Sequence, residues 1–342
     1  MTERRTVNVS VVGATGLVGR EMLRLLDSRD FPVDTLRAFA SERSEGTTVW
    51  SGEHMVEVEA LSREALLATG SGLVLASAGK AVSALLREWV RGTDLVVVDN
   101  SSAFRMDPAV PLVVPEVNPD ATAGHEGYIA NPNCTTTPLA VVLSAVRNLA
   151  GLEEVFVATY QSVSGAGNKA MEELAHQTMS LLTEQEVETE VFPHRIAFNL
   201  IPQIGDVRSD GYTEEERKVV DESRKILGMP DLIVSCTAVR VPTFACHGEA
   251  VHLVTKEDVS RDALVLALGN APGITVLDAP REFVYPMPIN TVEAEDVFVG
   301  RVRKHPDKPC TYDLWIVADN LWKGAALNSL QIAERLLADG RL

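Results

Sequence analysis

The segment NPNCTTTPLAVVLSAV, residues 131–146, places a cysteine between an Asn-Pro-Asn turn and a run of threonines, where an apolar helix is expected to begin. Pro138 falls within the first turn of a helix that starts near Thr135, a position where proline costs little. Cys134 would then lie at or next to the N-cap, where free backbone amides and the helix dipole favour a thiolate over a thiol. A buried structural cysteine is the alternative. The setting favours a nucleophile.

A nucleophilic cysteine beside a dinucleotide site would indicate chemistry at the carbonyl level: the thiolate attacks an aldehyde or an activated acyl group, and the cofactor removes or delivers a hydride. Residues 7–28 predict such a site, because an apolar strand runs into a glycine turn and then a helical pattern. Gly13, Gly16 and Gly19 form GxxGxxG rather than the more usual GxGxxG. Glycines let the backbone approach a pyrophosphate at the helix N-terminus. A merely structural turn is the alternative, and the strand and helix on either side argue against it.

Strand-like and helix-like stretches then alternate, as in parallel sheets covered on both faces, at residues 35–40, 73–77, 80–90 and 94–105. Ligands of such sheets lie off the carboxyl ends of the strands. Residues 77–79 and 100–105 occupy those ends. Asn100 and Arg105 are therefore candidates for binding an anion, with an ordinary solvated arginine as the alternative.

The second half has a different pattern. Residues 153–177 predict a long strand, a glycine turn and another helix, and residues 236–255 and 296–320 predict long alternating strands. These favour a mixed or antiparallel sheet suited to substrate binding and subunit contact. Residues 320–337 read as a closing amphipathic helix. The sequence thus predicts an α/β protein with a Rossmann-like dinucleotide-binding domain and a second α+β catalytic and dimerisation domain built on a mixed sheet.

The charge and hydropathy of the chain limit the classes of partner that it can bind. The net charge of −17 and pI of about 4.9 argue against binding nucleic acid or an anionic membrane surface through bulk electrostatics. No apolar run approaches the roughly 18 residues of a membrane helix. The N-terminus faintly resembles a signal peptide, but Asn8, Ser10 and Gly13 interrupt its apolar run, so it is read as a strand and a cytoplasmic protein is expected.

A metal site is not expected. The four cysteines form no CxxC pair and fit no zinc spacing. The segment HGEAVH, residues 247–252, is not HExxH, and on a helix its two histidines would point about 140° apart.

Eight motifs in order resemble the aspartate-β-semialdehyde dehydrogenase family over nearly the whole chain: GATGLVG (13–19), NSSAFRMD (100–107), NPNCTT (131–136), TYQSVSGAG (159–167), IAFNLIPQIG (196–205), GYTEEERK (211–218), VRVPTFACHGEAV (239–251) and DNLWKGAALNSLQIAE (319–334). The resemblance implies a nucleotide-binding domain of residues 1–131 and 320–342, and a catalytic and dimerisation domain of residues 132–319. It also implies at least a homodimer, with a tetramer as the alternative.

The resemblance implies a role for each matching residue. Cys134 would be the nucleophile, Gln161 would orient the substrate, and His247 would be the acid/base. Arg240 would bind the substrate α-carboxylate, and Glu215 would bind its amino group. The phosphate would be bound by Arg105, Lys218 and Asn100. Taken alone, His247 would more often be an ordinary hydrogen-bonded histidine, and Glu215 and Lys218 would more often belong to a solvated helix face.

NADP is the cofactor that the resemblance implies, held by Gly13, Ala14, Thr15, Gly16, Leu17, Val18, Ser41, Arg43, Ser44, Ser77, Ala78, Gly79, Ser164, Gly165 and Asn320. The loop at residues 41–46 lies where a dinucleotide fold places its ribose-binding residue. Arg43 would suit a 2′-phosphate, and Glu42 could instead accept a hydrogen bond from the 2′-hydroxyl of NAD.

The implied reaction is the reversible NADPH-dependent reduction of L-aspartyl-4-phosphate to L-aspartate-4-semialdehyde and phosphate, on the route to lysine, methionine and threonine. N-acetyl-γ-glutamyl-phosphate reductase is the enzymatic alternative, but its motif reads closer to Asn-Pro-Gly-Cys-Tyr. A non-catalytic dinucleotide-binding regulator is the other alternative. Two positions depart from the family pattern: Cys246, where glycine is usual, and Trp322, where a basic or small apolar residue is common.

Overall fold

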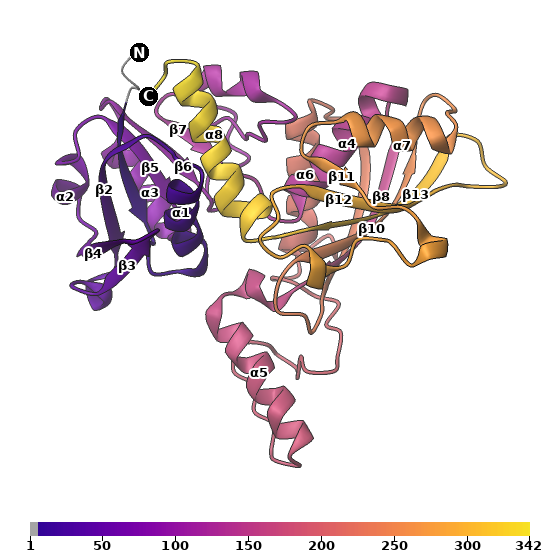
Figure 1. The fold of residues 1–342 in the computed structure, drawn as a ribbon, viewed down its shortest axis with the longest axis horizontal. Helices are drawn as coiled ribbons and strands as arrows, with labels where there is room; N and C mark the ends of the chain where they lie inside the picture. Colours follow the sequence, from indigo (N-terminus) through magenta and orange to yellow (C-terminus); the bar gives the residue numbers. More distant parts are fainter. Residues whose placement is uncertain (1–5) are drawn as a thin grey trace. The chain divides into compact units, whose positions relative to one another are not determined.

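The computed structural model describes residues 6–342, which form two compact units. One unit extends to Asn133 and resumes with Ala325–Leu342, and the other is Cys134–Gly324. Residues 320–324, which the sequence assigned to the nucleotide-binding domain, lie in the second unit, where Asn320 is hydrogen-bonded to Ser162 and Ser164. Each unit is built around its own sheet (Figure 1).

The first unit contains a seven-stranded sheet in the order β3-β4-β2-β1-β5-β6-β7. All neighbouring strands are parallel except β3 and β4. This confirms the Rossmann-like fold. The strands are β1 (Val7–Val12), β2 (Val33–Ala40), β3 (Thr48–Ser51), β4 (His54–Ala60), β5 (Gly72–Ala76), β6 (Leu95–Asp99) and β7 (Tyr128–Ala130), and the α-helices are α1 (Leu17–Ser28), α2 (Arg63–Leu67), α3 (Lys80–Trp89) and α8 (Leu327–Ala338).

The central strands of this unit are buried, and their carboxyl ends are aligned. Every residue of β5 and β6 is buried, as expected of central parallel strands that are apolar throughout. The carboxyl ends of β1, β5 and β6 lie side by side, since Val12 pairs with Ala76 and Ala76 pairs with Asp99. The turns that follow these three strands therefore meet at one edge of the sheet.

The second unit contains a six-stranded mixed sheet in the order β11-β12-β13-β10-β8-β9. The β8–β9 and β11–β12 pairs are parallel, and the others are antiparallel. This confirms the expected mixed sheet. The strands are β8 (Glu154–Gln161), β9 (Ile233–Arg240), β10 (His247–Val254), β11 (Ile274–Val276), β12 (Val297–Lys304) and β13 (Thr311–Ala318), and the α-helices are α4 (Thr136–Ala150), α5 (Asn168–Leu182), α6 (Glu214–Leu227) and α7 (Arg261–Asn270).

Helices α4, α6 and α7 pack on one face of this sheet (Figure 1). In β8, the buried residues alternate with more exposed ones, which is the period of a strand with one face in the core. On the opposite face, Phe156, Tyr160 and Ile233 are exposed. Helix α5 and the segment after it project away from the sheet (Figure 1).

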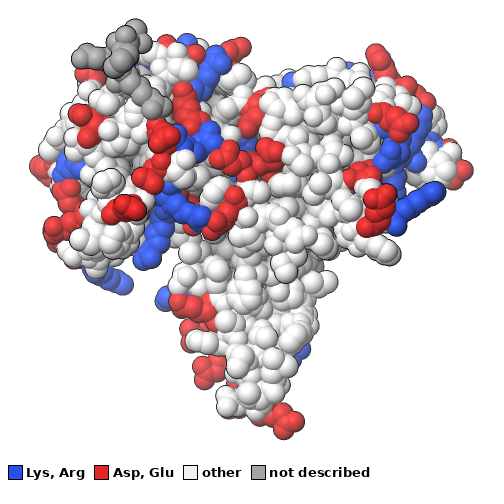
Figure 2. All heavy atoms as spheres, viewed as in Figure 1, with Lys and Arg blue, Asp and Glu red and all other residues white. Residues whose placement is uncertain are grey.

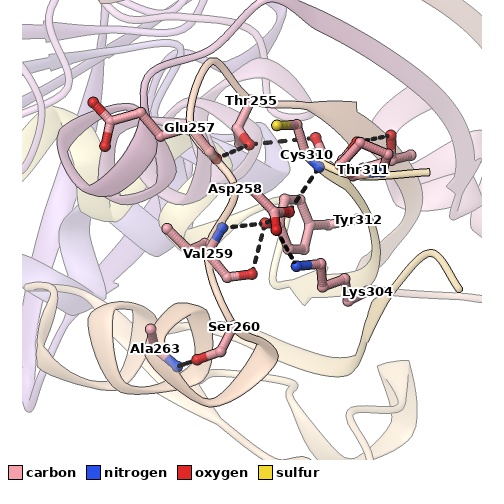
Figure 3. Close-up of polar contacts among 11 residues, drawn as sticks. Thr255, Glu257, Asp258, Val259, Ser260, Ala263, Lys304, Cys310, Thr311 and Tyr312 are labelled. Carbon is pink, nitrogen blue, oxygen red and sulfur yellow. Dashed lines mark hydrogen bonds and ion pairs between the residues drawn. The ribbon is translucent and has the colours of Figure 1, made fainter.

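A polar cluster fastens the loop between β10 and α7 to the β12–β13 hairpin (Figure 3). Asp258 accepts a hydrogen bond from the Cys310 amide at 2.9 Å and pairs with Lys304 at 2.6 Å. The Tyr312 hydroxyl donates to the Val259 carbonyl and accepts from the Val259 amide, both at 2.8 Å. The Ser260 side chain then caps α7 by accepting from the amide of Ala263. These bonds fix where α7 starts over the sheet.

The closing helix is shorter than expected. Trp322–Ala326 form a π-helical turn, and the α-helix begins only at Leu327. The reason is Asp319. Its side chain accepts hydrogen bonds from the backbone amides of Leu321 and Trp322, and its carbonyl accepts one from the amide of Gly324, which is the five-residue spacing of a π-helix. Separately, among residues 6–342 no helix is long and apolar enough to cross a membrane.

Candidate active site

Cys134 lies two residues before helix α4, whose N-cap is Thr135. Its side chain is partly exposed, whereas Cys236 and Cys246 are buried. The cysteine therefore lies next to the N-cap of a buried helix, where the positive end of the helix dipole favours an anionic sulfur.

His247 is the first residue of β10 and is 1% exposed. Its Nε2 lies 3.5 Å from the Sγ of Cys134, so residues from two distant parts of the sequence meet. Burial, and then the positive charge of Arg240, lower the pKa of His247 to about 3, and Glu215 partly opposes this shift. The imidazole is therefore neutral at physiological pH.

Gln161, at the end of β8, is tied to the beginning of helix α6. Its amide nitrogen donates to the Glu215 carboxylate at 3.1 Å, and Lys218 donates to the other carboxylate oxygen at 2.9 Å. Helix α6 begins here because Thr213 and Glu216 form a capping box. Glu215 is buried, so this chain of contacts holds a negative charge at a defined place rather than on a solvated helix face.

Arg240 ends β9 with its guanidinium inside the protein, at 6% exposure. One guanidinium nitrogen donates to the Ser162 carbonyl at 2.6 Å. Burial lowers the pKa of Arg240, and the nearby Glu215 and Cys134 oppose that effect. A side chain built on Gly165 would come within 3.1 Å of this guanidinium and 3.4 Å of the His247 ring. Gly165 thus leaves open the space that Arg240 and His247 both border.

Ser164, Gly165 and Asn320 were expected at the cofactor, and in the structure they lie beside the candidate catalytic residues. The Asn320 oxygen accepts hydrogen bonds from the Cys246 amide at 3.0 Å and from the hydroxyls of Ser162 and Ser164 at 3.2 and 3.1 Å. Ser162 was not singled out from the sequence. Its place in the TYQSVSGAG motif, directly after Gln161, was the signal that could have indicated it.

Cys246 departs from the family's usual glycine, and its backbone shows why glycine is usual. Its φ is +63°, in the left-handed region that L-residues with side chains rarely adopt. Burial raises the pKa of its thiol to about 12. Cys246 is therefore a protonated core thiol rather than a second nucleophile. Trp322 is also buried, in the π-helical turn.

In the first unit, the glycine turn has the shape of a nucleotide-binding loop. Gly13 has φ +84°, and a side chain there would come within 2.3 Å of the Ser77 carbonyl. A side chain on Gly19 would come within 2.2 Å of the Gly13 carbonyl. Gly16 is the N-cap of α1 without a side-chain partner, which leaves the first amides of the helix for a ligand. The remaining residues of this turn are Ala14, Thr15, Leu17 and Val18.

The other expected residues of this unit lie at the carboxyl ends of its strands. Ser41 is the N-cap of a short 3₁₀ turn, Glu42–Ser44, in which Arg43 is exposed. Ser77, Ala78 and Gly79 connect β5 to α3. The Asn100 amide donates to Ser329 at 2.8 Å, and the buried Arg105 donates to the Asn100 carbonyl at 2.7 Å. The described part of the chain contains no cluster of three or more His, Cys, Asp or Glu side chains suited to a metal.

Gly324 was missed from the sequence, although it lies against the nucleophile. A side chain there would come within 2.8 Å of the Cys134 Cβ and 2.9 Å of its Cα. We expect Gly324→Ala to lower kcat about ten- to a hundredfold, because displacing a reacting group by about 1 Å has an effect of that size. Steady-state kinetics measures it, with Gly269→Ala as control, since the nearest atom to a side chain at Gly269 is 3.9 Å away. Equal kcat values for Gly324→Ala and wild type would contradict this positioning role.

Comparisons with known proteins agree with these observations. The model of the semialdehyde dehydrogenase NAD-binding domain matches residues 8–125, and that of the semialdehyde dehydrogenase dimerisation domain matches residues 143–323. The chain is 45% identical to aspartate-semialdehyde dehydrogenase of Bacillus subtilis over 340 residues, covering 97% of this chain and 98% of that one. It is also 45% identical to the Aquifex aeolicus enzyme over 338 residues, with 97% and 98% covered.

Solved structures give the same result. Aspartate semialdehyde dehydrogenase II from Vibrio cholerae superposes with a TM-score of 0.93 at 42% identity, covering 98% of this chain and 99% of that chain. A structure of the same enzyme complexed with ASA gives a TM-score of 0.93 at 41% identity, with the same coverage. The resemblance inferred from the ordered motifs is thereby confirmed, and the chain belongs to the aspartate-semialdehyde dehydrogenase family of oxidoreductases.

Proposed function

We propose that this protein catalyses the reversible NADPH-dependent reduction of L-aspartyl-4-phosphate to L-aspartate-4-semialdehyde, with release of phosphate, in the cytoplasmic synthesis of lysine, methionine and threonine. One observation carries the proposal: Cys134 Sγ lies 3.5 Å from His247 Nε2 at the beginning of a buried helix. A cysteine in this setting can displace phosphate from an acyl phosphate and hold the acyl group as a thioester. Bound NADPH supplies the hydride that reduces this thioester.

The charges around the cysteine suit an amino-acid substrate. The buried Arg240 guanidinium offers the planar, two-pronged donor that binds a carboxylate. Glu215 offers a buried carboxylate for an ammonium group, held in place by Gln161 and Lys218. Because both charges lie in the unit that carries Cys134, they can bind the α-carbon end of the substrate while its acyl carbon faces the sulfur. We assign Arg105, Asn100 and Lys218 to the phosphate.

Side chains at Gly13 and Gly19 would collide with neighbouring backbone, so this tight turn requires glycine at both positions. A turn of this kind lets a dinucleotide approach the backbone closely, which supports a cofactor site here. We assign the pyrophosphate to the amides at the beginning of α1 and the adenosine 2′-phosphate to Ser41, Arg43 and Ser44. Ser77–Gly79, Ser164, Gly165 and Asn320 are assigned to the rest of the dinucleotide. In these assignments, the first unit binds the pyrophosphate and the 2′-phosphate of the cofactor, and the second unit binds the amino-acid end of the substrate.

The reaction is tested by measuring phosphate-dependent reduction of NADP⁺ with aspartate semialdehyde, with N-acetylglutamate semialdehyde as the control substrate. We expect turnover with the first aldehyde and at most a trace with the second. A preference for the acetylated substrate would assign the chain to N-acetyl-γ-glutamyl-phosphate reduction. Absence of turnover with both, despite dinucleotide binding, would favour a non-catalytic regulator.

Cofactor choice gives a separate prediction. We expect wild type to favour NADP⁺ over NAD⁺ at least tenfold in kcat/KM, and Arg43→Ala to lose most of that preference with little change in the NAD⁺ rate. The reason is that a charge-assisted hydrogen bond is worth roughly 1.5–3 kcal/mol, or about ten- to a hundredfold in affinity. Equal or better wild-type turnover with NAD⁺ would mean that Glu42 binds the ribose instead.

We further propose that the protein forms at least a homodimer through the second unit, with a tetramer as the alternative assembly. The sheet face opposite α4, α6 and α7 exposes Phe156, Tyr160 and Ile233, and the α5 helix exposes Met179 and Leu182. In the view of Figure 2, the middle of the projecting α5 segment is uncharged, and acidic side chains lie along its left edge and at its tip. Apolar surface of this extent favours burial against a second copy of the chain. Sedimentation analysis tests the assembly directly.

A further inference from the structure

Asp99 is the last residue of β6, and its carboxylate is completely buried. One carboxylate oxygen accepts hydrogen bonds from the Ser83 hydroxyl and from the Ser101 backbone amide, both at 3.0 Å. The other accepts from the Ser101 hydroxyl at 2.6 Å and from the Tyr128 hydroxyl at 2.9 Å. Four donors thus surround a group that can only accept, and such a buried charge is tolerated only because its hydrogen bonds are made.

The donors come from elements before and after Asp99 in the chain. Ser83 lies on α3, Ser101 follows β6 by two residues, and Tyr128 is the first residue of β7. Burial, and then the charge and hydrogen bond of Asp99, raise the pKa of Tyr128 above its ordinary value, so its hydroxyl keeps its proton and donates. The Ser83 hydroxyl also donates to the Gly79 carbonyl at 3.1 Å, in the turn that follows β5. Asp99 therefore joins α3 and β7 to the loop after its own strand.

This loop, residues 100–107, takes its shape from the carboxylate and from the packing of Phe104. The Ser101 hydroxyl, which donates to the carboxylate, accepts a hydrogen bond from the Ala103 amide at 3.2 Å. The Phe104 ring lies edge-on to the Tyr128 ring, with the ring centroids 5.5 Å apart. The tyrosine that donates to Asp99 therefore also holds the residue directly before Arg105.

Arg105 is the charged residue of the loop that we assign to the phosphate. Its side chain is buried, and its guanidinium donates to the Asn100 carbonyl at 2.7 Å, so the arginine is bonded to the first residue of its own loop. Arg87 on α3 pairs with Asp107 at 2.6 Å and holds the far end of the loop. The place of the guanidinium thus depends on the backbone of the whole loop.

We infer that Asp99 is a positioning residue for the phosphate site, because its carboxylate shapes the loop that places the Arg105 guanidinium. The inference rests on the proposed function for the assignment of Arg105 to the phosphate. Asp99 acts through Arg105 and not by contact with substrate, since its carboxylate is completely buried and both oxygens are occupied.

Two opposing effects make the sign of the result informative. On charge alone, replacing Asp99 with a neutral residue would strengthen the binding of an anion to the same loop. As a hydrogen-bond acceptor, however, asparagine offers one oxygen where four donors converge, and its amide hydrogens would point at some of those donors. Buried donors without an acceptor are costly, and the loop can relieve them only by moving. We therefore expect Asp99→Asn to weaken phosphate binding.

The dependence of turnover on phosphate measures this effect. In Asp99→Asn, KM for phosphate should rise about tenfold or more, the effect of losing one hydrogen bond to a charged group. KM for the aldehyde should stay within about twofold, because the residues assigned to its amino-acid end lie in the other unit. A KM for phosphate at or below that of wild type would overturn the inference.

A pair of tyrosine variants decides the question even where Asp99→Asn does not fold. Tyr128→Phe removes one neutral donor to the carboxylate and should raise KM for phosphate about two- to fivefold. Tyr312→Phe is the matched control, because it removes another buried hydroxyl, which donates to the Val259 carbonyl in the second unit. It should leave KM for phosphate unchanged. Equal effects of the two variants on this KM would contradict the positioning role.

Direct binding of inorganic phosphate, followed by the line width of its ³¹P NMR signal without aldehyde, tests the inference apart from turnover. Asp99→Asn and Arg105→Gln should each weaken binding, and the double variant should bind no more weakly than Arg105→Gln alone, because one residue acts through the other. Losses that add, binding that survives Arg105→Gln, or no binding by wild type would overturn the inference. An inactive wild type that showed the expected binding pattern would disprove the proposed reaction and leave the inference standing.

Discussion

Replacing Cys134 with alanine is expected to abolish turnover, with kcat reduced by more than about a thousandfold, while the fold persists. Of the other cysteines, Cys236 and Cys246 are buried and Cys310 lies in the β12–β13 hairpin, and losing a nucleophile typically costs at least that much. The removed side chain is small and partly exposed, so unfolding does not explain the loss. Steady-state kinetics measures kcat, and circular dichroism with NADP⁺ binding shows that both units remain folded. Activity above about a thousandth of wild type would rule out the covalent route.

Alkylation supplies the control for this prediction. Cys134 should be labelled first and should be protected by bound substrate. Cys236 and Cys246 should react slowly, because burial raises the pKa of both thiols. Faster labelling of either buried cysteine would mean that the activated thiol has been misassigned.

The parts of the fold that the sequence predicted correctly rest on short-range patterns. The strand, glycine turn and helix of residues 7–28 appear as β1 and α1, because a short apolar run, the helical spacing after it and the backbone freedom of Gly13 are local properties. The position of Cys134 next to the N-cap of α4 also follows from neighbouring residues. The β3–β4 hairpin was not assigned, although a Ser-Gly pair at residues 51–52 and alternating residues after it were the available signal.

The site itself depends on long-range contacts that no local pattern encodes. Ser162 and His247 are 85 residues apart, and Ser162 and Asn320 are 158 apart. Periodicity predicts strands β8 and β10 but not that the loop after one of them offers its amide to the first residue of the other. The motifs of the family pointed to His247 and Arg240, and only the structure shows the carbonyl and amide of Ser162 that orient both.

The predicted beginning of the final helix was wrong for a related reason. Residues 320–337 have helical periodicity, but Asp319 captures the amides at the beginning and sets a π-helical turn. A π-turn is favoured at functional sites, where it presents backbone that a regular helix would withdraw. Here the turn brings Gly324 against Cys134, so the residue that breaks the pattern is also the one that faces the nucleophile.

Replacing Arg240 with lysine is expected to be nearly as damaging as replacing it with alanine, with kcat/KM for the aldehyde reduced about a hundredfold or more. Removing one partner of a buried, hydrogen-bonded charge pair costs roughly 2–5 kcal/mol. Lysine keeps the charge but loses the planar fork, and it cannot both reach the Ser162 carbonyl, now 2.6 Å from the guanidinium, and bind two carboxylate oxygens. Desolvation at this buried position also disfavours a lysine ammonium.

The distribution of the loss distinguishes substrate binding from support of the fold. KM for the amino-acid substrate should rise in Arg240→Lys, whereas NADP⁺ affinity should stay within about twofold, because the glycine turn belongs to the other unit. Arg147→Lys is a matched control, since the Arg147 guanidinium also donates to a backbone carbonyl at 2.6 Å, that of Leu227, and has no role in the proposed substrate site. It should retain aldehyde binding far better than Arg240→Lys does. If Arg240→Lys were fully active, the guanidinium would serve only to hold the Ser162 carbonyl, and the α-carboxylate would have to bind elsewhere.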